Sequence, residues 1–257
     1  MSGAEIILLA AAGAMAGAIN AVAGGGTLIT FPALLAFGVP AIVANATSTL
    51  ALVIGTFSGA YGYRRQLQAV KFLLWRFVPP SLAGGLMGGV LVTASGERLF
   101  AELVPFLLLF ATALFMAQGA VRQWLPVRAH RSVSGKAQGV GLAVVFQFFV
   151  ALYGGYFGAG IGILMLASLG LMGLEDIHEM NCLKTILGSL INQVAAVYFI
   201  VVGLVDWPRA GVMTAGALLG YFAGAHWSQR IPQKQVRWLI SAIGLGITVA
   251  LFWKELR

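Results

Sequence analysis

Long apolar runs separated by short polar stretches make up almost the whole chain. The runs at 39–63, 103–121 and 186–205 each offer the roughly 20 apolar residues that a helix needs to cross a hydrocarbon core of about 30 Å. This pattern predicts a polytopic helical membrane protein with little room for a soluble domain.

Glycine-rich breaks occur twice, each time inside an apolar stretch. The first has the sequence AGGGT at 23–27 and the second FGAGI at 157–161. A short apolar segment follows each break, at 27–37 and at 160–172. With a rise of about 1.5 Å per residue, neither segment can span the core alone. Broken helices at matching positions in two halves of a membrane chain indicate a transport site near the bilayer midplane.

The order of the elements repeats, which predicts an all-α fold with two homologous repeats at 1–122 and 137–257 and a basic linker at 123–136. We expect about eight full spans and two short half-helices. The glycines at 84 and 88 match those at 216 and 220, and small residues four apart predict close helix packing. The expected helices lie at 5–22, 27–37, 41–63, 72–93, 98–122, 137–156, 160–172, 176–203, 207–229 and 233–254.

The charge of matching loops reverses between the halves. The expected loop at 64–76 is basic, whereas its counterpart at 204–209 carries one arginine and one aspartate. The loop at 95–102 is mainly acidic, whereas its counterpart at 229–237 is basic. Because cytoplasmic loops are enriched in Lys and Arg, the reversal predicts inverted repeats with both termini outside. A rival arrangement with parallel halves and both termini inside accounts equally well for the total charge.

Composition narrows the class of protein. The chain is 60% hydrophobic and 9% charged, with a net charge of +8 and a mean hydropathy of +0.91. Its basic residues sit in short loops, which favours a topological role over nucleic-acid binding. The single cysteine, Cys182, excludes an internal disulfide and a Cys-rich metal site. The N-terminus is expected to be a retained first helix, because it lacks a basic region and a cleavage motif.

The glycine breaks are the first candidate site. A helix that begins inside the membrane exposes N–H groups and carries a partial positive charge, so it can hold an anion without a charged side chain. Glycine also lets the backbone approach a ligand closely. The alternative is a kink that only serves packing. The candidate anion-binding residues here are Gly24, Gly25, Gly26, Thr27, Gly158 and Gly160.

Polar residues after the breaks form the second candidate group. Asn45 and Thr49 share one helix face, and Asn181 and Thr185 repeat the pair. Lys184 places a charge inside an expected span, and a charged residue at such a position is by default a candidate functional residue. The alternatives are hydrogen bonds between helices and a lysine that reaches the membrane surface. Further candidates to line the cavity are Asn20 and Asn192.

No nucleophile, zinc or P-loop motif occurs, so we expect no enzyme, no metal and no cofactor. The expected partners are a small anionic substrate and membrane lipid, with a homo-oligomer as a further option and no nucleic acid.

These residues resemble the TauE/SafE family of sulfite exporters and related organic-anion permeases. The resemblance covers nearly the whole chain, although Ile161 stands where Thr27 stands in the first break. It implies a multi-pass protein of the bacterial or archaeal inner membrane that transports sulfur-containing anions. The matching pieces are Gly17 to Asn20, Gly24 to Thr27, Phe31 to Ala33, Asn45 to Thr47, Gly155 to Gly160, Lys184 with Thr185, Asn192, Phe199 and Gly203.

The expected function is secondary transport, in the export direction, of a small anion such as sulfite or an organosulfonate. The anion would be held between two half-helix ends, with alternating access to it. The alternatives are an anion channel on the same scaffold, a carrier of a non-sulfur organic acid, and a membrane subunit that mainly binds a partner protein.

Overall fold

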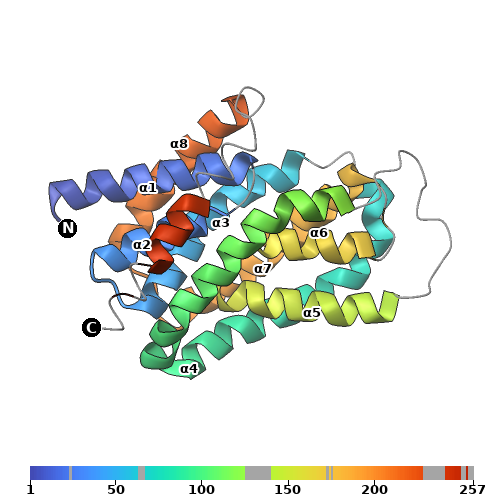
Figure 1. Cartoon of the computed structure of the whole chain (residues 1–257), viewed down its shortest axis with the longest axis horizontal. Helices are drawn as coiled ribbons and strands as arrows, with labels where there is room; N and C mark the ends of the chain where they lie inside the picture. Colours follow the sequence, from blue (N-terminus) through green and yellow to red (C-terminus); the bar gives the residue numbers. More distant parts are fainter. Residues whose placement is uncertain are drawn as a thin grey trace.

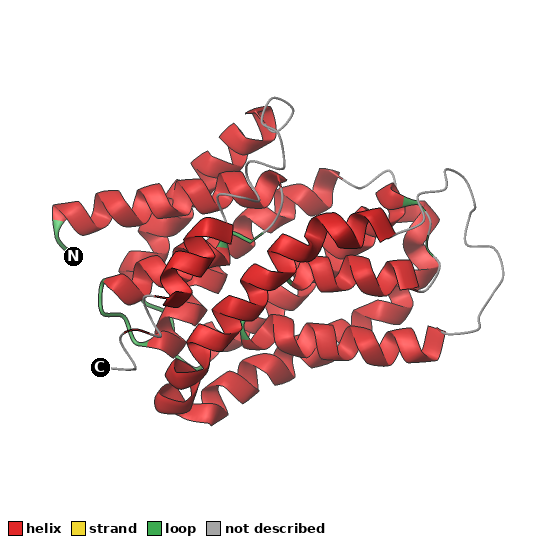
Figure 2. Ribbon diagram, in the orientation of Figure 1, coloured by secondary structure: helices red, strands yellow, loops and turns green. Residues whose placement is uncertain are grey.

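The computed structural model is mostly helical in the part of the chain that it describes. It describes residues 1–22, 25–62, 67–124, 140–171, 174, 176–227, 241–249 and 253. These residues contain helices, turns and loops but no strand (Figure 2). The predicted all-α fold is therefore confirmed for them.

The helices follow the predicted order closely (Figure 1). The predicted half-helices appear as α2 and α6, and residues 241–249 form a further helix. Most of the predicted linker at 123–136 and the loop at 229–237 lie outside the described residues. The helix bounds are α1 Gly3–Val22, α2 Thr27–Ala36, α3 Ala41–Gly62, α4 Leu67–Trp124, α5 Val140–Tyr156, α6 Ile161–Leu171, α7 Ile177–Val201 and α8 Trp207–Trp227.

Two predicted loops are wrong in their extent. The basic stretch expected as a loop at 64–76 is already helical from Leu67, where α4 begins. The loop expected at 95–102 is confined to Gly96, which has φ 74° and ψ 158°, while the residues on both sides are helical. Glycine reaches this backbone conformation without steric cost, so one residue replaces the expected loop. In Figure 1 the first part of α4 runs to the lower left, and the second part returns from there.

Helices α1 and α8 pack closely through small residues. A Cβ atom on Gly13 would overlap the carbonyl oxygen of Met213, and one on Gly17 would overlap that of Ala217. A Cβ atom on Gly220 would overlap the carbonyl oxygen of Ala14. Because the contact positions rise together along both helices, α1 and α8 run in the same direction. Such close backbone approach is the packing role expected of small residues four apart.

Helices α4 and α5 pack in the same manner. A Cβ atom on Gly84 would lie 2.5 Å from the carbonyl oxygen of Phe148, and one on Gly88 would overlap that of Leu152. The first part of α4 therefore runs parallel to α5. In Figure 1, α1 leads away from the N-terminus at the left, whereas α5 runs from right to left.

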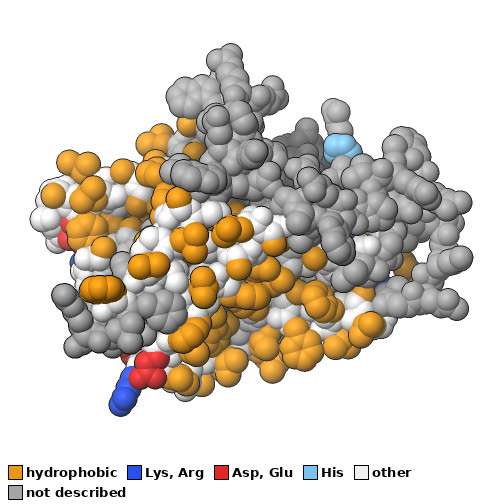
Figure 3. Space-filling view, viewed as in Figure 1, with side chains coloured by type: hydrophobic (Ala, Val, Ile, Leu, Met, Phe, Trp, Pro, Cys, Tyr) orange, Lys and Arg blue, Asp and Glu red, His pale blue; other side chains and the backbone are white. Residues whose placement is uncertain are grey.

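The surface of the described residues is largely apolar, as expected for a protein solvated by lipid. The view in Figure 3 shows hydrophobic side chains spread across the face that is not grey, with few charged groups. By length and composition, three helical stretches among the described residues could cross a membrane, at Gly3–Ala21, Leu67–Ala117 and His178–Val201. The stretch in α4 contains the turn at Gly96.

Candidate functional site

The first glycine break is held by side chains of three helices. Gly25 has φ 98° and lies so close to Phe115 of α4 that a Cβ atom would overlap the ring. The N–H of Gly26 donates to Oδ1 of Asn20 in the last turns of α1, at 2.7 Å. The Asn20 side-chain amide in turn donates to the hydroxyl of Tyr221 in α8, at 2.9 Å. Asn20 is therefore a cap for α2, a more specific role than that of a residue lining a cavity.

A chain of hydrogen bonds continues from this break to α3. The hydroxyl of Thr30 lies 3.2 Å from the carbonyl oxygen of Gly26, to which it donates, and 2.6 Å from the Ser48 hydroxyl. Both side chains are fully buried. The sequence reading missed Thr30, because a single hydroxyl in an apolar segment carries no distinctive pattern. Its spacing of four from Gly26 was the only available signal.

The start of α2 retains fewer unpaired donors than an open helix end would. The N–H of Gly26 is taken by Asn20. The next pairs are Leu28 N–H with the Gly25 carbonyl at 3.0 Å and Ile29 N–H with the Gly26 carbonyl at 2.9 Å. A bound anion would therefore have to compete for these groups or use Thr27, which is half-buried. Gly24 lies outside the described residues.

The second break relies on two glycines in the left-handed region. Gly158 has φ 82° and Gly160 has φ 81°. The hydroxyl of Tyr153 donates to the carbonyl oxygen of Ala159 at 2.7 Å, which ties the break to the preceding helix α5. A Cβ atom on Gly160 would lie 3.3 Å from Cδ1 of Leu114. This break is therefore packed against α4 as well.

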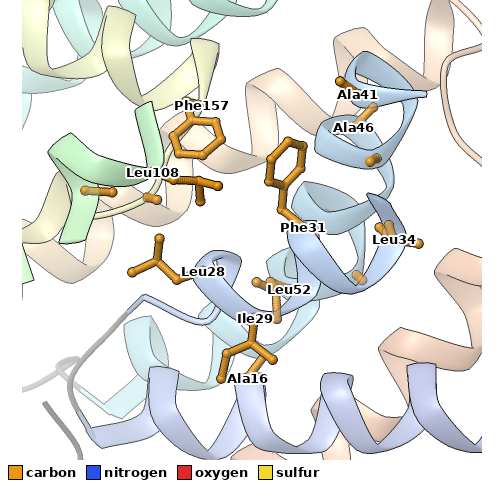
Figure 4. Packing of buried hydrophobic residues seen from close by; sticks show 14 of the residues in the cluster. Ala16, Leu28, Ile29, Phe31, Leu34, Ala41, Ala46, Leu52, Leu108 and Phe157 are labelled. Atoms are coloured by element: carbon orange, nitrogen blue, oxygen red, sulfur yellow. The ribbon is translucent and has the colours of Figure 1, made fainter. Parts of the chain in front are cut away.

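The two breaks approach the same turn of α4. Gly25 lies against Phe115, and Gly160 lies against the adjacent Leu114. The aromatic rings of Phe31 in α2 and Phe157 in the second break also meet edge to face, with centroids 5.4 Å apart. Figure 4 shows these two rings turned toward each other, with Leu108 of α4 beside them. Elements of both halves of the chain thus converge at one place in the interior.

Asn45 links α3 to the second break. Its side chain is 1% exposed, and its Nδ2 donates to the carbonyl oxygen of Tyr156, the last residue of α5, at 3.0 Å. Its Oδ1 is buried and has no hydrogen-bond partner among the described residues. Thr49, the other member of the predicted pair, donates its hydroxyl to the backbone carbonyl of Asn45 at 2.8 Å. The Thr49 hydroxyl thus bonds within its own helix.

Two polar residues of α7 lie beside the second break. A Cβ atom on Gly162, in the first turn of α6, would lie 3.3 Å from Cδ of Lys184. A Cβ atom on Gly158 would lie 3.6 Å from Oδ1 of Asn192. Both polar side chains are half-buried, as are two further predicted residues of α7, Asn181 and Thr185. The structure therefore brings Lys184 and Asn192 to the second break, and Asn45 reaches it from α3.

A family model described as "Sulfite exporter TauE/SafE" matches residues 9–251 of the chain. A "probable membrane transporter protein" of Haemophilus influenzae is 25% identical, over 97% of this chain and 95% of the relative. "Probable membrane transporter protein ORF9" of Sinorhizobium sp. is 28% identical, over 92% and 88%. "Probable membrane transporter protein YfcA" of Escherichia coli K12 is 25% identical, over 93% and 86%. No solved structure matches the chain.

Proposed function

The chain belongs to the TauE/SafE family of membrane transporters, and on that premise we propose that it exports small sulfur-containing anions across the inner membrane of the cell. The cargo would be sulfite or an organosulfonate. The mechanism would be that of a secondary carrier rather than of an enzyme. Outward movement of an anion is favoured by a membrane potential that is negative inside, at about 2.3 kcal/mol per charge and 100 mV.

The observation that carries this proposal is the meeting of the two glycine breaks at one turn of α4. A short helix begins directly after each break, so two helix N-termini belong to one region. Helix N-termini favour negative charge even where some N–H groups are paired, because the partial charge of the helix remains. Lys184 beside Gly162 would add a full positive charge to the second of these ends.

The proposed binding site combines the backbone at the breaks with polar side chains of both halves. Gly25, Gly26 and Thr27 would contribute from the first break. Gly158 and Gly160 would contribute from the second. The side chains proposed to complete the site are Asn20 through its cap on Gly26, with Asn45, Thr49, Asn181, Lys184, Thr185 and Asn192.

We further propose that the halves are inverted repeats. Two observations support this. The first helices of the two halves, α1 and α5, run in opposite directions. In addition, α1 packs in parallel against α8 of the second half, and α5 packs in parallel against the first part of α4 in the first half. The reversed charge of the predicted loops supports the same arrangement. Alternating access would then rock one repeat against the other around the glycine breaks.

Two other functions use the same site, namely an anion channel and a carrier of a non-sulfur organic acid. The decisive experiment is uptake of labelled sulfite, sulfate, small sulfonates and small carboxylates into liposomes that contain only this protein. We expect saturable uptake and exchange of sulfite or a sulfonate. Large single-channel currents would reject the carrier, and exclusive uptake of carboxylates would reject the sulfur cargo. Uptake by the purified chain alone would also show that no partner protein is needed.

Replacement of one lysine tests the charge at the site. We expect Lys184→Ala to weaken apparent affinity by about 10-fold or more, since a hydrogen bond to a charged group contributes about 1.5–3 kcal/mol. Lys184→Arg should retain part of the affinity. Lys71→Ala is the matched control, because Lys71 is exposed in the first turns of α4. Equal affinity of Lys184→Ala and the wild type would remove Lys184 from the site.

A further inference from the structure

The amide of Asn45 has a defined orientation. Its Nδ2 faces the carbonyl oxygen of Tyr156 at 3.0 Å. The reverse orientation would place two acceptor oxygens against each other, so the hydrogen-bond geometry decides which atom is nitrogen. The remaining atom, Oδ1, is therefore an acceptor.

Two hydroxyls that follow Asn45 by three and four residues on α3, those of Ser48 and Thr49, donate their protons to other acceptors. The hydroxyl of Thr49 donates to the Asn45 backbone carbonyl. Thr30 donates to Gly26, so the proton in its contact with Ser48 comes from the Ser48 hydroxyl. In the described part of the chain, Asn45 Oδ1 is thus a buried acceptor without a protein donor.

Such an atom has a substantial cost. Leaving a buried acceptor unpaired costs about 1–3 kcal/mol, and the large majority of buried polar groups have partners. Asn45 of α3 bonds to Tyr156 at the end of α5, directly before the second break, which is part of the proposed anion site. A free anion oxygen cannot pair with Oδ1, because both are acceptors. An anionic cargo can therefore pair with Oδ1 only through a group that carries a proton.

We propose that Asn45 Oδ1 accepts a hydrogen bond from the cargo, so that the transported anion carries an O–H or N–H donor next to its charged group. This inference rests on the proposed function. The helix ends and Lys184 would hold the charged group, and Asn45 would select anions that also donate. The donor has two chemical sources. It is either a hydroxyl or amino group on the carbon skeleton of a sulfonate, or the acid proton of a singly protonated oxyanion such as hydrogen sulfite.

The experiment compares anions of equal charge that differ in the donor. Liposomes with the full-length protein are tested for uptake of 2-hydroxyethanesulfonate and ethanesulfonate, both fully ionised at neutral pH. A second arm follows sulfite uptake across the pH range in which hydrogen sulfite loses its proton. In the first arm we expect uptake of the hydroxylated sulfonate to be preferred by about 10-fold, because pairing one buried acceptor contributes a free energy of that order. In the second arm the alternative expectation is that sulfite uptake follows the concentration of hydrogen sulfite. The first result identifies a skeletal donor, and the second identifies the acid proton.

Variants of Asn45 link the preference to this atom. Asn45→Leu removes the acceptor, so the preference should fall to near 1. In Asn45→Asp, a protonated carboxyl group can donate its O–H to the Tyr156 carbonyl, and its other oxygen remains an acceptor. The preference should therefore persist in this variant. Gln147→Leu is the matched control, because Gln147 is another buried amide but bonds to Ser81 between α5 and α4, at 2.9 Å. That variant should keep the wild-type preference.

The outcomes separate this inference from the proposed function. If the wild-type protein transports none of these anions, the proposed function fails. If the wild type transports both sulfonates equally and its sulfite uptake ignores the protonated fraction, only the inference fails. A preference that survives in Asn45→Leu would also overturn it, and Oδ1 would then be paired by an ordered water only. Because the wild type decides the first comparison, the test does not depend on the folding of a variant.

Discussion

Asn20 Oδ1 lies 2.7 Å from the backbone nitrogen of Gly26, so the last turns of α1 cap the helix that follows the first break. Asn20→Ala removes this cap and leaves a buried N–H unpaired, which costs about 1–3 kcal/mol. We expect a clear loss of thermal stability in detergent together with reduced uptake. Tyr221→Phe is the comparison, because it removes only the hydrogen bond on the other side of Asn20. A variant Asn20→Ala with normal stability but weaker cargo affinity would contradict the capping role and indicate direct contact with the cargo.

The position of Gly25 has no room for a side chain, and its backbone conformation is unfavourable for residues other than glycine. Its φ of 98° is disfavoured for other residues, and a Cβ atom would overlap the ring of Phe115. Gly25→Ala should therefore strongly reduce folded protein or uptake, since the left-handed conformation alone costs about 1–2 kcal/mol. Addition of Phe115→Ala should relieve the overlap but not the backbone cost, so the double variant should recover only in part.

Gly211→Ala is the control for this substitution, because no atom lies within 4 Å of the added Cβ in helix α8. It should behave like the wild type or be slightly more stable, as alanine favours helices. If Gly25→Ala and Gly211→Ala had the same melting temperature, the close packing of Gly25 against Phe115 would be refuted.

Glu97 begins the second part of α4 and caps the start of α3. Its carboxylate accepts from the N–H groups of Ala41 and Ile42, the second at 3.0 Å. A negative charge at a helix N-terminus is favourable, so Glu97→Ala should lower stability by about 1–2 kcal/mol. The measurement is the melting temperature in detergent. The melting temperature of Glu97→Gln should lie between those of the wild type and Glu97→Ala.

Glu102→Ala is the matched control for Glu97. Its partner Arg98 has a side chain that is 94% exposed, and exposed ion pairs contribute little. The melting temperature of this variant should stay close to that of the wild type. Equal losses in the two alanine variants would show that the cap on α3 contributes nothing specific.

The length and order of the helices could be predicted because the hydrophobic pattern dominates in lipid. Both half-helices begin within one residue of their expected starts, since the glycines that precede them interrupt the helix. The predicted loop at 95–102 contains the turn at Gly96, but the turn is confined to that one residue. Glu97 lies in that predicted loop, but in the structure it is helical and accepts from N–H groups more than 50 positions away, at Ala41 and Ile42.

The sequence indicates which residues are candidates for the site, but it does not indicate how their polar atoms are bonded. Glycines and amides were identified because they are unusual in apolar runs. Which atom of Asn20 or Asn45 is occupied depends on Gly26, Tyr221 and Tyr156, and two of these partners lie far away in the sequence. Hydrogen-bond direction therefore required the fold. The convergence of both breaks on α4 also depends on tertiary packing, which no local pattern encodes.

The orientation of the two halves can be tested by labelling at three exposed positions. Gln68 lies near the start of α4 and Ala94 near the end of its first part, so one helix separates them. Ala94 is adjacent to Thr93, whose hydroxyl lies 2.8 Å from that of Tyr198, so it shares an end of the bundle with Val202. Gln68 lies in the predicted loop at 64–76, and Val202 lies just before the predicted counterpart of that loop at 204–209.

Inverted repeats place Gln68 and Val202 on opposite sides of the membrane, whereas parallel repeats place them on the same side. We expect single cysteines at Ala94 and Val202 to react with an impermeant thiol reagent from one side, and a cysteine at Gln68 from the other. The background is Cys182→Ser, because Cys182 is the only native cysteine. Reaction of the cysteines at positions 68 and 202 from the same side would refute inversion. It would also refute the proposed alternating access, in which one inverted repeat rocks against the other around the two glycine breaks.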